Sequence, residues 1–319
     1  MKRKIKLWFV TAASLVLFGT VLILSTACSA DWNFKKVISD NYKTNVYEVE
    51  ESFESISIDS DTADITLLPA EDGKSKAVCF EKENVTHSVK VEKNTLTIKT
   101  VDERKWYDRI FDYSLDKITV YLPQSEYDSL LIRSATSDVK IPKELSFDDI
   151  DISISTGDVE CYASAAETVK IKTSTGHISV KQVYTNSLNL TAATGNIVVL
   201  NATCQGDVTV SVTTGKVYLT GVTCKNLTSS GSTGDIEMEK VTATEKFTIE
   251  RSTGEVEFDD CDAAEIFIET GTGDVEGSFL TGKDFETSTG TGKIEVPRNS
   301  TGGKCTIITG TGDIEIEIG

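Results

Sequence analysis

The chain of 319 residues has few of the residues that build common catalytic and metal sites: two histidines, four prolines and two methionines. The histidines, His87 and His177, are too few for a histidine-based metal site or triad, so we expect no metal, cofactor or catalytic residues. The seven cysteines form no CxxC pair, which argues against a zinc or thioredoxin-type motif.

Positive charge is also scarce, with 32 Lys and Arg against 50 Asp and Glu and a net charge of −18. Four of the cationic residues lie within the first six, so the rest of the chain carries about −22. Nucleic-acid binding needs a cationic surface and is therefore not expected. The acidity favours solubility, and it leaves open a partner with a basic surface or bound cations.

An uncharged, largely apolar run extends from residue 7 to 30, directly after the basic residues Lys2, Arg3, Lys4 and Lys6. Such a run can cross about 30 Å of hydrocarbon, and the basic flank places its start in the cytoplasm. We predict a single-pass membrane anchor over residues 1–30 with the remainder extracellular. Two alternatives stay open: a lipoprotein signal with lipidation at Cys28, and simple cleavage.

Residues 31–130 are predicted to form a less regular β segment that precedes the repeats. Alternation over 88–91 and 96–98, with a short turn between them, predicts a hairpin. Residues 61–65 resemble a repeat turn with Ala63 in the glycine place. The aromatic cluster of residues 104–113 has two interpretations, a plug for the end of the core or a patch that docks a partner. Its candidate interaction residues are Trp106, Tyr107 and Phe111.

Residues 131–319 are organised by a repeated Thr-Gly turn. The turn glycines follow one another at steps of 19 or 20 residues. They are Gly157, Gly176, Gly195, Gly215, Gly234, Gly254, Gly273, Gly292 and Gly312.

Aligned on these glycines, the positions seven and five before and two and four after are mainly apolar. Apolar residues alternate within a repeat and recur between repeats, which is typical of stacked half-buried strands. We therefore predict an all-β fold, a parallel β-solenoid with one coil per repeat and neighbouring coils about 4.8 Å apart. Coils that stack in chain order would leave residues 314–319 as an open edge, which Glu315 and Glu317 would protect by repulsion.

Three features of the repeats allow more than one interpretation. The residue after each glycine is polar but of mixed charge, which favours a turn role over a weak cation site. Arg251 falls on an inward position, so it either escapes to the surface at a bulge or pairs inside and marks a specialised coil, and we keep it as a candidate interaction residue. Cys204 and Cys224 occupy equivalent places in adjacent coils, where they are either buried small side chains or a disulfide.

The basic tail, the apolar segment, the start Asp31-Trp32-Asn33-Phe34 and the serial Ser-Thr-Gly-Asp turns together resemble a bacterial "putative adhesin" family of cell-envelope proteins. The resemblance covers about residues 50 to 319. It implies a β-solenoid at the cell envelope. Some members are encoded beside envelope-stress regulators, which implies a second kind of role, as an accessory protein of the stress response. It supplies no catalytic residues.

The leading functional hypothesis is a membrane-anchored extracellular adhesin or surface-binding module whose partner is a cell-surface polymer. An accessory or sensor protein that contacts an envelope protein near Trp106 is the alternative. A polysaccharide-acting enzyme is the third class. It needs paired carboxylates in a groove, and coils of uniform length offer no long loop to build one.

Overall fold

In the computed structural model the described residues are 42–105, 116–298 and 300–319. The chain divides into two compact units, 1–42 and 43–319, and the second is described here. The predicted membrane segment, Cys28, Trp106, Tyr107 and Phe111 lie outside the described residues. Within the described part of the chain, no helix is long and apolar enough to cross a membrane.

The described residues form one sheet system of 28 strands without a helix. The first group precedes the regular coils: β1 (Tyr42–Val49), β2 (Ser55–Ser60), β3 (Asp64–Pro69), β4 (Ser75–Lys82), β5 (Val85–Glu92), β6 (Thr95–Asp102) and β7 (Lys117–Leu122). The next group is β8 (Glu126–Thr136), β9 (Val139–Ile141), β10 (Ser146–Thr156), β11 (Val159–Cys161), β12 (Ser164–Thr175), β13 (Ile178–Lys181), β14 (Tyr184–Thr185), β15 (Ser187–Thr194), β16 (Ile197–Leu200), β17 (Thr203–Cys204), β18 (Asp207–Thr214) and β19 (Val217–Thr220). The last group is β20 (Thr223–Thr233), β21 (Ile236–Glu239), β22 (Thr242–Thr253), β23 (Val256–Thr272), β24 (Val275–Phe279), β25 (Lys283–Thr291), β26 (Ile294–Glu295), β27 (Gly303–Thr311) and β28 (Ile314–Ile318).

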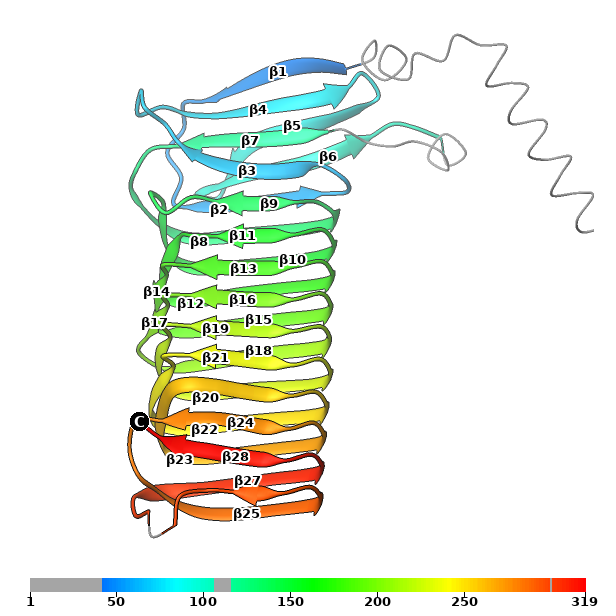
Figure 1. The fold of residues 1–319 in the computed structure, drawn as a ribbon. Coiled ribbons are helices and arrows are strands. Elements are labelled where there is room, and N and C mark those ends of the chain that lie inside the picture. The colour runs from blue at the N-terminus through cyan, green and yellow to red at the C-terminus, as the bar shows by residue number, and fades with distance from the viewer. Residues whose placement is uncertain (1–41, 106–115, 299) are drawn as a thin grey trace, which may run out of the picture. The chain divides into compact units, whose positions relative to one another are not determined.

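The predicted parallel β-solenoid is confirmed (Figure 1). In each coil a long strand leads into the Thr-Gly turn and a short strand leaves it, as β10 and β11 do around Gly157. Both strands pair in parallel with their counterparts in the next coil, so that Ile152 lies beside Ile171 and Val159 beside Ile178. Because the apolar columns coincide, the coils share one continuous buried core.

The turn glycines are required by how closely the coils approach. Gly195 has φ +134°, and a Cβ there would lie 2.0 Å from the carbonyl oxygen of Gly176 in the neighbouring coil. Its N–H donates to the carbonyl of Thr214 on the other side, at 3.0 Å. Glycine is therefore needed for backbone conformation and for space at once.

The residue after each turn glycine has a structural role. The side chain of Asp158 accepts a hydrogen bond from the backbone N–H of His177, and Nδ1 of His177 accepts one from the N–H of Asn196. Asn196 in turn accepts from the N–H of Lys216. Neutral and charged acceptors serve equally, which explains why Asp, His and Asn share this column. Lys216 and Lys293 have no acceptor and take part only as backbone N–H donors.

Regular stacking begins earlier in the sequence than predicted. Ile65 pairs with Val139, which pairs with Val159, so Ala63 and Ser137 occupy the glycine place in two further coils. The first of these confirms the predicted turn at residues 61–65. The predicted boundary between residues 130 and 131 falls inside β8.

Coil order is inverted at the N-terminal end of the stack. The coil of β2 and β3 lies between that of β6 and β7 and that of β8 and β9. Next to this coil, β5 pairs antiparallel with β6 and β4 pairs antiparallel with β7. Strand β1 pairs with β4. The predicted hairpin is confirmed as β5–β6, with Lys93 and Asn94 both at positive φ in its turn.

Coil order is inverted at the other end as well, and here the prediction of stacking in chain order is wrong. Strand β27 pairs with β23 on one side and β25 on the other, while β28 pairs with β24 and β26. The coil of β25 and β26 is thus the outermost described coil (Figure 1). Strand β26 pairs with Ile314 and Glu315 of β28, so the outermost edge belongs to residues 283–295.

Candidate functional site

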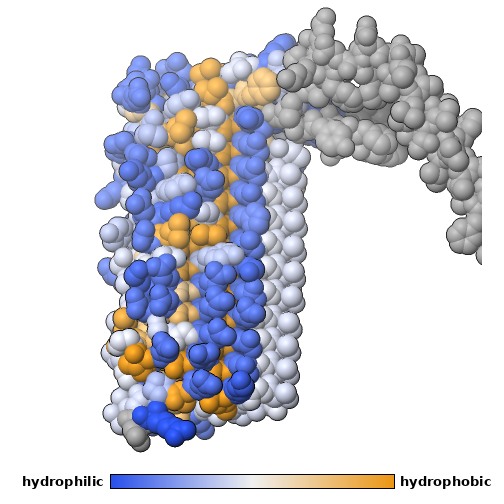
Figure 2. All heavy atoms as spheres, in the orientation of Figure 1, coloured by the Kyte–Doolittle hydropathy of each residue, from blue (hydrophilic) through white to orange (hydrophobic). Residues whose placement is uncertain are grey.

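Glutamates stack in register along one side of the C-terminal coils. Glu237 pairs with Glu257, Glu257 with Glu276, Glu276 with Glu315, and Glu315 with Glu295. Each stands three residues after its turn glycine, on the solvent side of the short strands. We call these five residues the glutamate ladder. Figure 2 shows the solenoid in the orientation of Figure 1, with a pale column along the edge where the turns lie and a row of hydrophilic side chains beside it.

A groove of about 640 Å³ follows the glutamate ladder from Glu237 to Glu315. Its lining includes Phe258 and Gly277, which belong to the inward column of the short strands, and a Cβ at Gly277 would lie 2.6 Å from Cδ2 of Phe258 in the core. Glycine at this place therefore leaves room for the ring, which also stacks on Phe279 at 4.5 Å between centroids. The other lining residues are mostly acidic: Tyr218, Thr220, Glu237, Met238, Glu239, Glu257, Asp259, Glu276, Ser278, Glu315 and Glu317.

Few cations offset this charge. Lys216 contacts Glu237 at 3.8 Å and Lys240 contacts Glu239 at 2.6 Å. Among the described residues, Glu257, Glu276 and Glu315 have no ion-pair partner. Burial and then the neighbouring carboxylates, Asp274 first, raise the pKa of Glu276 above its ordinary value. The centre of the groove is therefore a region of unrelieved negative potential.

The groove corrects one step of the sequence argument. Coils of uniform length do form a groove without any inserted loop, because it lies between the outward side chains three and five residues after the turn glycines. The signal was present in the sequence: the position three after the glycine is Glu in each of the last five repeats. This column is neither apolar nor part of the turn, so it does not stand out in the pattern that predicts the core.

Arg251 lies inside the coil, with a side chain only 5% exposed, so the surface-escape alternative is wrong. Its Nη2 donates to Oγ of Ser229 at 2.9 Å and its Nη1 to the carbonyl of Glu250 at 3.3 Å. Burial lowers the pKa of Arg251 to about 10. A partner could not reach this side chain without opening the coil.

The six described cysteines are free and buried, including Cys204 and Cys224. The structure therefore shows these two as small core side chains, with no disulfide between them. Burial raises the pKa of the Cys204 and Cys224 thiols to about 12, which keeps both protonated and unreactive at neutral pH.

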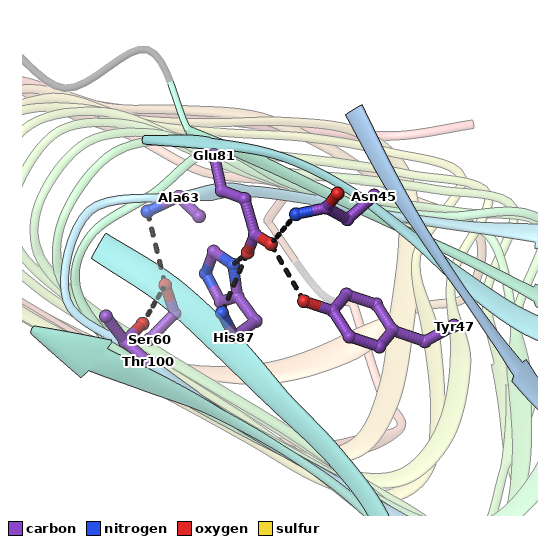
Figure 3. A network of polar contacts seen from close by, with 7 residues as sticks. All are labelled: Asn45, Tyr47, Ser60, Ala63, Glu81, His87 and Thr100. Atoms are coloured by element: carbon purple, nitrogen blue, oxygen red, sulfur yellow. Dashed lines mark hydrogen bonds and ion pairs between the residues drawn. The ribbon is translucent and has the colours of Figure 1, made fainter. Parts of the chain in front are cut away.

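A second polar cluster lies between β4 and β5, at the N-terminal end of the core. The carboxylate of Glu81 accepts hydrogen bonds from Asn45 Nδ2 at 2.6 Å, Tyr47 Oη at 2.8 Å and the backbone N–H of His87 at 2.7 Å. Nδ1 of His87 lies 2.7 Å from the same carboxylate (Figure 3). Cys79 lies two residues before Glu81 on the same inward face, and its sulfur is within 4.8 Å of the nearest ligand atoms of Glu81 and His87.

The chain resembles solved structures in fold. It is 13% identical to a "putative adhesin" from Parabacteroides distasonis, with 88% of this chain and 98% of that chain covered and a TM-score of 0.50. It is 17% identical to a "putative lipid binding protein" from the same organism, with coverage of 75% and 97% and a TM-score of 0.51. No curated protein matches the sequence.

The model of the Toastrack DUF4097 family matches residues 53–211 and 202–319. These two matches together span nearly all of the described solenoid, and they agree with the adhesin-like resemblance drawn from the repeats. The chain therefore belongs to the Toastrack DUF4097 family.

Proposed function

We propose that this protein is a non-catalytic binding module of the cell envelope, anchored in the membrane by residues 1–30, with its solenoid outside the cell. The groove along the glutamate ladder is its binding site, and the ligand is positively charged, such as a surface polymer that carries amines. The ladder is the observation that carries this proposal. The names of the two structural neighbours, an adhesin and a lipid-binding protein, are compatible with a binding role.

Holding the glutamates of the ladder in register opposes folding through electrostatic repulsion. Parallel strands hold equivalent residues about 4.8 Å apart, and two unit charges at that distance repel by roughly 1 kcal/mol even in water. Five consecutive glutamates accumulate this cost, and among the described residues only Glu237, at one end, has a lysine partner. A ligand with regularly spaced cations relieves the repulsion, so the free energy lost on folding is recovered on binding.

A fluorescent lysine hexamer, with a glutamate hexamer as the comparison, tests the site on the full chain in detergent. The double variant Glu257→Gln/Glu276→Gln should weaken binding of the lysine hexamer at least about tenfold, and added salt should weaken binding to the wild type. The matched control is Glu250→Gln/Glu269→Gln, which removes two stacked, exposed glutamates outside the groove. Equal losses in both double variants would show attraction to net charge alone and reject the groove.

The envelope role needs a separate experiment. Whole cells that express the chain should expose the solenoid to added protease, and a Trp106→Ala/Tyr107→Ala variant should keep its ligand in a pull-down. Loss of a specific membrane protein in that variant would support the accessory role instead.

Paired carboxylates also serve glycoside hydrolases, at separations of about 5–9.5 Å. We favour binding because the carboxylates continue along the groove beyond a pair. Release of reducing ends from wall glycans by the wild type, but not by Glu276→Gln, would establish catalysis and overturn this part of the proposal.

A further inference from the structure

The cluster of Cys79, Glu81 and His87 brings together three side chains of the kind that bind transition metals. Cys79 and Glu81 alternate inward on β4, and His87 points inward from β5, which follows β4 after a tight turn. Their exposed fractions are 0%, 1% and 3%. One potential ligand atom from each lies within 4.8 Å of the other two, and no other group of this kind occurs among the described residues.

The protein leaves part of this cluster unsatisfied. The carboxylate of Glu81 is buried beside a thiol and has His87 as its only ion-pair partner in the described part of the chain. Nε2 of His87 is buried and has no hydrogen-bond partner among the described residues. A buried polar atom without a partner costs about 1–3 kcal/mol, so a network that served only to fill the core would be expected to satisfy it.

We propose that Cys79, Glu81 and His87 form a binding site for one divalent metal ion of the zinc class. Thiolate, carboxylate and imidazole are the ligands that zinc takes in proteins, and three protein ligands leave a fourth position for a hydroxyl or a water molecule. On binding, the thiol of Cys79 releases its proton to solvent. The unpartnered Nε2 of His87 binds the metal through its lone pair, while Nδ1 keeps its proton and its contact with Glu81.

The surrounding residues fit the role of outer partners. Asn45 and Tyr47 on β1 both donate to Oε1 of Glu81, which fixes the orientation of the carboxylate (Figure 3). Outer partners of this kind hold metal ligands in place. The metal would thus fasten β1 and the antiparallel strands β4 and β5 at the end of the solenoid core, which is a structural role separate from the groove.

Metal titration of the untagged full chain in detergent tests the site. After treatment with a chelator, the wild type should take up one Zn²⁺ per chain, and Co²⁺ should give the absorption band of a cobalt–thiolate bond. Changes of outer partners typically cost about 10–100-fold in metal affinity, so Tyr47→Phe should fall in this range and Cys79→Ser or His87→Gln should lose more. Cys161→Ser and His177→Gln are matched controls outside the cluster and should bind as the wild type does.

The outcomes separate the metal site from two alternatives. Failure of the wild type to bind Zn²⁺, or absence of the cobalt–thiolate band, would show that the cluster is only a buried hydrogen-bond network. Loss of Zn²⁺ uptake in Glu257→Gln/Glu276→Gln, with no loss in Cys79→Ser, would place the ion in the groove. Circular dichroism shows whether each variant is folded, and because the cobalt spectrum is measured on the wild type, it decides the matter even if a variant unfolds.

Discussion

The guanidinium of Arg251 occupies the space that a side chain at Gly231 would need. A Cβ built at Gly231 would lie 2.5 Å from Nη1 of Arg251, and the two residues are paired in adjacent coils. Ser229, two residues earlier, supplies the hydroxyl that accepts from Nη2. A small residue and a hydroxyl in one coil thus accommodate the buried cation of the next.

This relationship predicts coupling between the two positions. Gly231→Ala should destabilise the protein by about 1–3 kcal/mol because the methyl group meets the guanidinium. Arg251→Thr, which copies Thr270 in the next coil, removes that contact, so the double variant should be less destabilised than the sum of the singles by at least about 1 kcal/mol. Recovery stays partial, since the methyl group also meets the carbonyl of Val212 at 2.5 Å. Denaturant unfolding of the four proteins measures the coupling, and strict additivity would contradict it.

The turn glycines should tolerate no side chain. Gly195→Ala forces a methyl group to within 2.0 Å of a neighbouring carbonyl at a φ of +134°, and should cost about 2–4 kcal/mol. Gly73→Ala is the control, because Gly73 also has positive φ but nothing lies within 4 Å of its Cβ position. It should cost about 1 kcal/mol. Thermal unfolding compares the two, and equal losses would show that close packing of the coils is not the reason for glycine.

Engineered cysteine pairs test the inverted coil order. Glu269 and Ile308 are exposed partners on β23 and β27, so Glu269→Cys/Ile308→Cys should form a disulfide on mild oxidation. Glu269→Cys/Ser288→Cys places the thiols two coils apart, about 9.6 Å, and should not cross-link. Stacking in chain order predicts the opposite result. Mass spectrometry of the digested, oxidised chains identifies which bond has formed.

The glutamate ladder predicts a pH dependence of stability. The pKa of Glu276 is raised in the folded protein, first by burial and then by Asp274, Glu315 and Glu257. The folded state therefore binds a proton more readily than the unfolded state, and ionised Glu276 opposes folding above its raised pKa. Glu276→Gln should increase the unfolding temperature slightly at pH 7, because the group is exposed and screened.

This advantage should shrink as the pH falls through the raised pKa towards the ordinary value for glutamate, because the wild-type carboxyl then becomes neutral too. Glu269→Gln outside the groove serves as the control. An advantage that persists unchanged at low pH would show that the gain comes from something other than charge.

The repeated columns made the coil predictable, since Ile152, Ile171 and their equivalents recur at fixed distances from a glycine. The same repetition made the order of the coils unpredictable. The N–H of Gly273 donates to the carbonyl of Thr311, and the equivalent carbonyl of Thr291 would present the same acceptor. When every turn offers the same donor and acceptor, local sequence cannot determine which coil stacks on which.

The two candidate sites differ in how far the sequence reveals them. The ladder follows from one more aligned column, because register in a parallel solenoid places equal positions side by side. Alternation likewise puts Cys79 and Glu81 on one face of β4. Their contact with His87 depends on how β4 and β5 pack over the end of the core. The contact of Glu81 with Asn45 and Tyr47 depends on how β1 packs there. Local sequence patterns specify neither arrangement.

The inverted coil order also has a consequence for synthesis. Residues 283–295 leave the ribosome before residues 303–318, yet their parallel strand partners are β27 and β28. Folding that advances coil by coil as the chain grows can proceed through β24 and must then pause. The tip of the solenoid is assembled only when the later segment has been made and has taken its place between the two earlier coils.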